Sequence, residues 1–304
     1  MNRSENLTGA LLMVTSMAAF TINDALVKAL AEMAPLYEVL FLRGVLTTVA
    51  VAAIAWKLGV LMPRLSRKDW GIIILRTGAE TGGAFFFFSA LSHIPIANIT
   101  AIMQAVPLTI TLAAALVLGE HVGWRRLAAI LVGLGGVMLI VRPGASDFTV
   151  YSLYGLAAVG LVTVRDLSTR QLAPDTPSFF VTLVTSAAMT VLFGLACLGS
   201  EWVTPTPEVL GLSAAAAALL IAGYQFIIMA MRVGEVGAIA PFRYTGLIWA
   251  LLLGWVAFGE WPSLVTLAGA AIVVASGMFT LLRESRLSRA ERVAETSRTE
   301  PRGY

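Results

Sequence analysis

The sequence predicts an all-α polytopic membrane protein with ten transmembrane helices, and two features of its composition carry this prediction. Of the 304 residues, 58% are hydrophobic and only 13% are charged, whereas a soluble protein has about 25% charged residues. The charges are also unevenly placed, because Arg283–Tyr304 holds six Arg and four Glu of the 21 basic and 18 acidic residues. The chain before this tail is therefore expected to use lipid as its solvent.

Apolar runs of about 20 residues, the length of a helix that crosses a bilayer, recur along the whole chain. Five lie in the first half, at 8–31, 36–57, 69–91, 96–118 and 124–141. Five more lie in the second half, at 150–172, 178–200, 207–231, 236–258 and 263–283. The connections are short and several contain Pro or Gly, which interrupt helices. Each run is therefore assigned one spanning helix.

Basic residues alternate from loop to loop, and this alternation predicts the orientation. The N-terminus has Arg3, and the loops at 57–68 and 125–126 are basic, as is the tail. The loops between them offer Arg142 and little else. Because cytoplasmic loops carry the excess of Lys and Arg, both termini are expected in the cytoplasm, with the chain in a bacterial-type cytoplasmic (inner) membrane. The polar tail 284–304 is expected to be disordered.

Three segments of the first half recur in order in the second half, at a nearly constant offset. Thr21–Leu30 matches Thr163–Leu172, Gly83–Leu91 matches Gly223–Met231, and Leu118-Gly119-Glu120 matches Phe258-Gly259-Glu260. The repeats are 1–145 and 146–283, and each holds five spans. An odd number of spans inverts the second copy, so we expect a pseudo-two-fold axis in the membrane plane and a site near the midplane.

This arrangement resembles the EamA-type families of the drug/metabolite transporter superfamily. The residues that carry the resemblance are Leu118-Gly119-Glu120 before Val122-Gly123-Trp124, Phe258-Gly259-Glu260 before Pro262, and the glycine-rich fifth span before Arg142-Pro143-Gly144. The likeness covers 8–283. It implies that the first four spans of each half surround a cavity, that the fifth is more peripheral, and that the chain transports a small solute. Members move amino acids, nucleotide sugars, sugar phosphates and vitamins, so the resemblance leaves the substrate open.

Several function classes are excluded by missing motifs. The sequence has one cysteine, two histidines, no HExxH, no glycine-rich phosphate loop and no Gly-x-Ser-x-Gly elbow. We therefore expect no cofactor, no metal and no ATP hydrolysis. The net charge of +3 comes from loop and tail arginines, so a nucleic-acid partner is not expected. The expected partners are a small-molecule substrate and the lipid bilayer; Ala129, Gly133, Gly136, Gly269 and Gly277 suit tight helix packing or a homodimer seam.

Ionisable residues inside the spans are the candidate functional residues, because each costs about 2.5–3.5 kcal/mol at a span centre unless it pairs or faces a cavity. The expected substrate-binding residues are Arg43, Glu80, Gln104, Tyr224, Gln225, Arg243, Tyr244 and Trp249. The expected gate or proton-coupling residues are Asp24, Lys28, Arg76, Arg165, Asp166 and Arg170.

Glu80 is the strongest single candidate. It lies in the middle of its span, one helical turn after Arg76, where a carboxylate can carry a proton or hold a substrate amine. The alternative is a buried Arg76–Glu80 ion pair. Arg243 follows Pro241 and can fork onto a carboxylate or phosphate; its alternative is a salt bridge to Glu80 or Asp24.

Asp24 and Asp166 are related by the repeat, so inversion places them at opposite depths. Each is expected at a gate or a cavity rim. The alternative is a helical ion pair with the base four residues on, Lys28 or Arg170, which is the favourable order. Glu120 and Glu260 lie at the interfaces and are expected to cap helices.

The mixed acidic and basic lining favours a secondary active transporter for a zwitterion, such as an amino acid, working by alternating access and driven by protons or exchange. One alternative is an intramembrane aspartyl enzyme, which needs two carboxylates about 3 Å apart and is opposed by the different depths of the two aspartates. Another is a non-transporting receptor or scaffold, which does not explain charges that recur within the spans of an inverted repeat.

Overall fold

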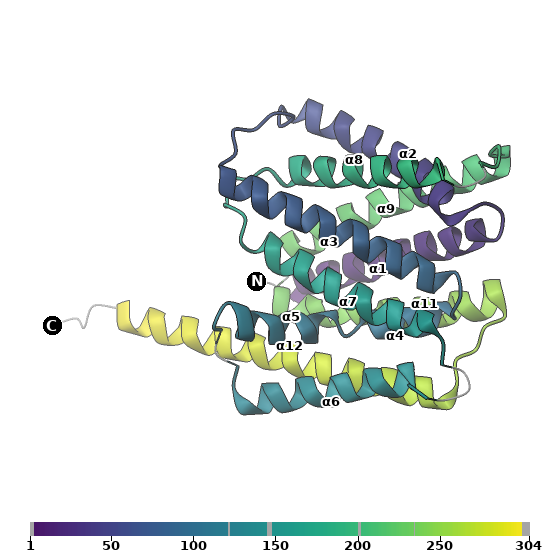
Figure 1. The fold of residues 1–304 in the computed structure, drawn as a ribbon. Coiled ribbons are helices and arrows are strands. Elements are labelled where there is room, and N and C mark those ends of the chain that lie inside the picture. Colours follow the sequence, from purple (N-terminus) through teal and green to yellow (C-terminus); the bar gives the residue numbers. More distant parts are fainter. Residues whose placement is uncertain (1–2, 121, 145–147, 200–201, 234, 300–304) are drawn as a thin grey trace.

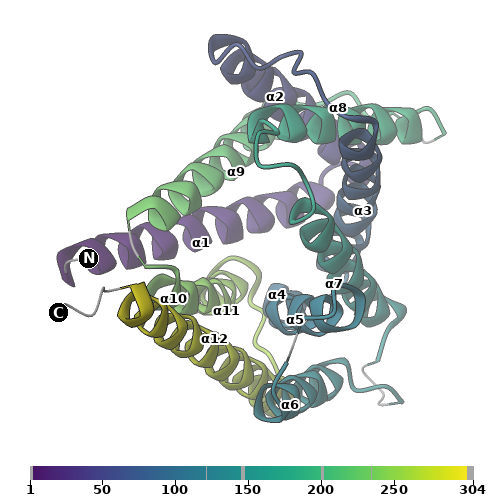
Figure 2. The same ribbon diagram turned by 90° about the vertical axis from the view of Figure 1, so that its left-hand side faces the viewer.

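A computed structural model of the chain is built of helices that lie side by side in a bundle (Figure 1). It describes residues 3–120, 122–144, 148–199, 202–233 and 235–299. The start of α1 and the end of α12 lie at the same end of the bundle (Figures 1 and 2). We call this the terminal end and the opposite one the distal end. Helix α1 runs from the terminal to the distal end, and each later span reverses the direction.

The helices match the predicted runs closely. The first half contains α1 (Arg3–Ala31), α2 (Leu36–Lys57), α3 (Arg67–Leu91), α4 (Ile96–Met103), α5 (Val106–Val117) and α6 (Trp124–Val141). The second half contains α7 (Val150–Thr169), α8 (Ser178–Cys197), α9 (Pro207–Val233), α10 (Val236–Ile239), the 3-10 helix η1 (Ala240–Tyr244), α11 (Thr245–Phe258) and α12 (Leu264–Thr299). No strand occurs among the described residues.

Within the described ranges, nine helical segments are long and apolar enough to cross a membrane, counting α4 with α5 and η1 with α11. The predicted third span is the exception, because α3 does not meet this standard. It is nevertheless a continuous helix of 25 residues, and Figure 1 shows it running along the bundle like the other spans. Arg76 and Glu80 lower its mean hydropathy, and both are candidate functional residues of the sequence analysis.

The fourth span of each half is interrupted at the same place. Helix α4 ends at Met103 and α5 starts at Val106, while η1 precedes α11. Pro107 and Pro241 lie at these breaks, where a proline lacks the N–H that helix continuation requires. The amide of Gln104 donates to the carbonyl oxygen of Tyr244 at 3.5 Å, so the two breaks face each other inside the bundle.

The main helix pairs join one half of the chain to the other. Helix α1 packs on α9 and α11, α7 packs on α3 and α5, α2 on α8, and α6 on α12 (Figure 2). A side chain at Gly136 or Gly269 would meet the carbonyl oxygen of the other glycine at 2.8 or 2.6 Å. These glycines therefore serve close packing of α6 on α12 within one chain, and the homodimer stays a prediction.

The tail differs from the expectation as far as it is described. Disorder is expected from residue 284, yet α12 continues as helix to Thr299. The segment is rich in Ala, Arg and Glu, which are good helix formers, and it extends a helix that is already nucleated. The expectation for 300–304 lies outside the described residues.

Candidate functional site

Charged side chains gather in the bundle interior as two clusters at different depths. The terminal cluster consists of Arg76 and Glu80 of α3 with Arg165 and Asp166 of α7. The distal cluster consists of Asn23 and Asp24 of α1 with Arg43 of α2. The positions of these residues along their helices place the first cluster toward the terminal end and the second toward the distal end.

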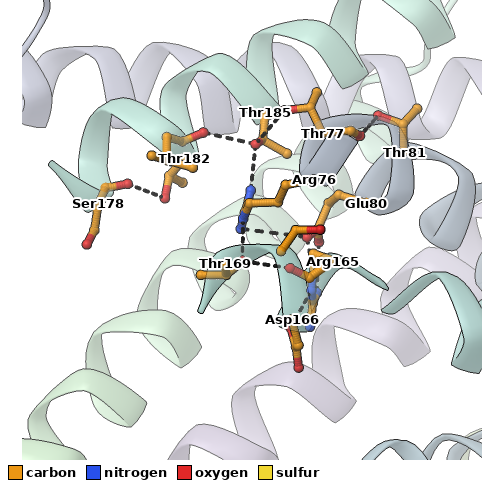
Figure 3. Close-up of polar contacts among 12 residues, drawn as sticks. Arg76, Thr77, Glu80, Thr81, Arg165, Asp166, Thr169, Ser178, Thr182 and Thr185 are labelled. Atoms are coloured by element: carbon orange, nitrogen blue, oxygen red, sulfur yellow. Dashed lines mark hydrogen bonds and ion pairs between the residues drawn. The ribbon is translucent and has the colours of Figure 1, made fainter. Parts of the chain in front are cut away.

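Arg165 is the centre of the terminal cluster (Figure 3). Its Nη1 donates to both carboxylate oxygens of Glu80 at 3.1 Å, and its Nε donates to Oδ1 of Asp166 at 2.7 Å. Arg76 brings a second cation to Glu80, with Nη2 at 3.8 Å from Oε2. Two acids and two bases are thus held together, which nearly cancels their charge.

Threonine hydroxyls fix Arg76 in this network. Its Nε donates to Oγ1 of Thr169 at 2.9 Å, and its Nη1 donates to Oγ1 of Thr185 at 2.7 Å (Figure 3). The Thr185 hydroxyl also lies 3.2 Å from that of Thr77. Helices α3, α7 and α8 are therefore tied together at this depth, and the expected Arg76–Glu80 pair is one contact within a larger network.

The distal cluster is smaller and contains a neutral member. Nη1 of Arg43 donates to Oδ1 of Asn23 at 3.1 Å, and Nδ2 of Asn23 donates to Oδ1 of Asp24 at 2.9 Å. The guanidinium of Arg43 also lies over the ring of Phe88, 4.7 Å from its centroid. Asn23 is buried and is a site residue that the sequence reasoning missed. It holds the position in the first repeat that Arg165 holds in the second, and this match is the signal that could have found it.

Tyr224 of α9 lies between the two clusters. It interacts electrostatically with Arg43 of the distal cluster and with Glu80, Arg165 and Arg76 of the terminal cluster. The residue is nevertheless 45% exposed. Tyr224 is thus accessible at a position next to charges from three other helices, and its ring packs edge-on against Phe20 with the centroids 5.1 Å apart.

Arg243 of η1 lies near the terminal cluster, because it interacts electrostatically with Asp166 and Arg165. It is exposed, and its strongest electrostatic attraction is to Asp166. In the part of the chain that the structure describes, Arg243 forms no ion pair, neither with Glu80 nor with Asp24. Arg243 and Asp166 are therefore a base and an acid that lie near one another without closing on each other.

The remaining predicted binding residues are spread more widely. Gln104 makes its contact with the backbone of η1, and Gln225 and Trp249 are half-buried on α9 and α11. Tyr244 is separated from its neighbour Arg243, because its side chain is buried with the hydroxyl directed at Gly277 of α12. That hydroxyl has no hydrogen-bond partner among the described residues.

Lys28 and Arg170 pair across the two halves and not along their own helices. Nζ of Lys28 lies 2.6 Å from Oε1 of Glu260, and Nη1 of Arg170 lies 4.0 Å from Oε1 of Glu120. These contacts replace the expected helical ion pairs Asp24–Lys28 and Asp166–Arg170. Glu260 also caps a helix, as expected, because its Oε2 accepts from the N–H of Ile96 at the start of α4, at 3.0 Å.

Comparison with known proteins assigns the family. The sequence model of the EamA-like transporter family matches residues 7–142 and 150–282. The chain belongs to this family. Individual relatives are similar over nearly their full length. The riboflavin transporter of Vibrio cholerae is 30% identical over 298 residues, covering 94% of this chain and 97% of the relative.

Two further relatives carry other solutes. The pseudopaline exporter CntI of Pseudomonas aeruginosa is 28% identical over 274 residues, which are 88% of this chain and 93% of the relative. The S-adenosylmethionine uptake transporter of Rickettsia prowazekii is 24% identical over 286 residues, or 92% and 94%. One protein crystal structure aligns with a TM-score of 0.62 at 23% identity, covering 94% of this chain and 99% of that one, which shows a common fold.

These likenesses fix the broad class of this EamA-like protein. It is a multi-pass bacterial-type membrane transporter of a small metabolite, and its relatives are transporters rather than enzymes. The aspartyl-enzyme alternative is therefore excluded. The geometry agrees, because Asp24 is bonded to Asn23 and Asp166 to Arg165, on separate helices.

Proposed function

We propose that this EamA-like protein is a secondary active transporter that moves a small zwitterion, such as an amino acid, across the cytoplasmic membrane. One observation carries the substrate class: Arg243 and Asp166 attract each other electrostatically but form no ion pair in the part of the chain that is described. A substrate with a carboxylate and an ammonium close together fits between such a base and acid. The planar guanidinium forks onto the carboxylate, and Asp166 accepts from the ammonium through Oδ2, since Arg165 bonds to Oδ1.

The other charges of the interior are less suited to a substrate because they are already engaged. Glu80 is occupied by Arg165 and Arg76, and Arg43 is held by Asn23 and Phe88. Tyr224, exposed between the clusters, is placed to cover the apolar part of the substrate. Gln225 and Trp249 complete the lining.

Alternating access follows from the inverted repeat, which is part of the proposal. Its support is that the packing pairs exchange when the halves are exchanged: α1 with α9 corresponds to α7 with α3, while α2–α8 and α6–α12 correspond to themselves. The breaks at Gln104 and Tyr244 also hold matching positions of the two sequence repeats. The Lys and Arg distribution supports a cytoplasmic location of the terminal end.

The driving energy is a proton gradient or exchange of substrates. A proton on Glu80 weakens its attraction to Arg165 and Arg76, and this frees Arg165 to rearrange with Asp166. Glu80 thereby couples proton binding to the shape of the cavity.

The test is counterflow in proteoliposomes with three matched probes: an amino acid, the amine that lacks its carboxylate and the acid that lacks its amine. The amino acid alone is expected to exchange. Exchange of the amine or the acid as fast as the amino acid would overturn the zwitterion assignment, as would exchange of riboflavin without any amino acid.

A further inference from the structure

The two ends of the bundle hold equivalent acid–base pairs in different states. At the distal end, Lys28 and Glu260 are 2.6 Å apart and their side chains are 7% and 22% exposed. At the terminal end, Arg170 and Glu120 are 4.0 Å apart and 54% and 51% exposed. One pair is closed and largely dry, and the other is loose and wet.

Both the sequence and the backbone conformation show that the two acid–base pairs are equivalent. Lys28 matches Arg170 and Glu120 matches Glu260 when the two sequence repeats are aligned. Each glutamate follows a glycine, Gly119 or Gly259, whose φ is +70° or +65°. This left-handed conformation, which glycine adopts without strain, ends the fourth span of each half in the same turn. Each pair joins a base of one half to an acid of the other.

The distal pair also ties together several helix ends. Nζ of Lys28 donates to the carbonyl oxygen of Ile94 at 2.8 Å and lies 5.2 Å from the ring centroid of Phe258. Glu260 accepts from the N–H of Ile96 at 3.0 Å. The end of α1, the start of α4 and the end of α11 are thereby joined. For Glu120 and Arg170 no side-chain hydrogen bond is found among the described residues.

We propose that Lys28–Glu260 and Arg170–Glu120 are the two alternating gates of one transport cycle, and that this structure is closed at the distal end and open at the terminal end. The inference rests on the proposed alternating access. Separating a buried pair leaves charges without compensation, so the distal gate opens when the terminal pair closes and supplies an equivalent contact. The protein then alternates between two states, each with one of the two pairs closed, and a substrate can shift the balance between these states.

Accessibility to a membrane-impermeant maleimide tests the gates directly. Cys197 is the sole cysteine of the sequence, so Cys197→Ala supplies the background and Tyr224→Cys supplies an exposed interior reporter. Labelling is measured from the distal side in cells or right-side-out vesicles and from the terminal side in inverted vesicles. The parent is expected to label mainly from the terminal side.

Glu260→Gln is the central variant, because the amide keeps an oxygen for the N–H of Ile96 while the charge is removed. Distal labelling is expected to rise about tenfold, since Lys28 loses its partner. Arg170→Gln is expected to leave distal labelling at or below the parent level. Glu208→Gln at the distal end and Arg232→Gln at the terminal end, both exposed, are matched controls for loss of charge alone. Lys28→Arg keeps the charge and is expected to keep distal labelling low.

Distal labelling that stays at the parent level in Glu260→Gln, or that rises equally in Glu208→Gln, would overturn the gates. A cooperative thermal unfolding transition of the purified protein shows that each variant is folded. The gate proposal and the proposed substrate class can be contradicted independently of each other. If Glu260→Gln shifts labelling to the distal side but the protein exchanges no amino acid, the gate proposal is supported and only the assignment of a zwitterionic substrate is wrong. If the protein exchanges amino acids but every variant is labelled like the parent, the gate proposal is wrong and the proposed transport function stands.

Discussion

The distal and terminal clusters occupy repeat-related positions but have different chemistry. Asp24 accepts a hydrogen bond from the neutral amide of Asn23 at 2.9 Å, whereas Asp166 accepts from the guanidinium of Arg165 at 2.7 Å. Asn23 and Arg165 themselves hold matching positions of the two repeats. One exchange of an amide for a guanidinium therefore distinguishes the clusters, and Glu80, whose repeat-related residue is Leu220, adds to the difference.

This difference teaches that matching positions of the two sequence halves carry different polar side chains. A symmetric lining would present the same group to both ends of a substrate. The asymmetric lining presents a nearly balanced network on one side and a small, largely buried cluster on the other, with Arg243 and Asp166 open between the helices. This asymmetry supports the proposed zwitterion over a simple cation as the substrate.

The largest effect is expected from Glu80→Gln. The change removes the acidic partner of Arg76 and one of the two acidic partners of Arg165, so transport is expected to fall by about 100-fold. The residual flux is expected to lose its dependence on pH, because the proposed proton carrier is gone. Flux of a labelled amino acid across a pH series measures both, with Glu208→Gln as the control. Flux with the parent rate and pH profile would remove Glu80 from the mechanism.

Arg243→Gln is expected to act on the substrate carboxylate alone. Loss of charge-assisted hydrogen bonds raises KM for the amino acid about 10- to 100-fold. The KM of Arg243→Lys is expected to lie between those of the parent and Arg243→Gln, since lysine keeps the charge but not the forked geometry of the guanidinium. The KM for the amino acid in Glu208→Gln serves as the control and is expected to match the parent. An unchanged KM in Arg243→Gln would mean that Arg243 does not bind the carboxylate.

Asn23→Ala tests the distal cluster with a smaller change. Arg43 loses a partner at 3.1 Å, and the rate of amino-acid flux is expected to drop about 3- to 10-fold. Thr21→Val on the same helix is the control, because the Thr21 hydroxyl bonds to its own helix at Met17. An effect as large as that of Glu80→Gln would contradict the difference between the clusters.

Thr185→Val is expected to give the smallest effect. It removes the bonds to Arg76 and Thr77 but no charge, so flux is expected to fall about 2- to 5-fold. Thr182→Val, whose hydroxyl bonds to Ser178 of the same helix, is the matched control. Equal flux in the two variants would show that the threonine contacts of the terminal cluster are incidental.

Much of this architecture could be predicted from the sequence because the bilayer imposes length and apolarity on each span. The same reasoning explains why α3 stands apart, since the charges of Arg76 and Glu80 reduce its apolarity. The partners of Lys28 and Arg170 could not be predicted in this way. Sequence spacing reveals contacts between neighbouring turns of one helix, whereas Glu260 and Lys28 come from opposite halves of the chain. The sequence repeat could have pointed to these partners, because it relates the pair Lys28–Glu260 to the pair Arg170–Glu120.

The direction of a side chain at a helix break was also beyond the sequence. Arg243 and Tyr244 are neighbours in η1, yet the first is exposed and the second is buried against α12. A 3-10 turn rotates successive side chains differently from an α-helix, and the proline does not specify where the turn begins.

Thermal unfolding of the purified protein with the three matched probes tests the central claim most directly. A ligand that binds the folded state raises the apparent Tm by mass action. The amino acid is expected to raise Tm in the parent and to lose this effect in Arg243→Gln, while the amine and the acid alone give little shift. Equal stabilisation by the amine, undiminished in Arg243→Gln, would contradict a zwitterion site built on Arg243 and Asp166.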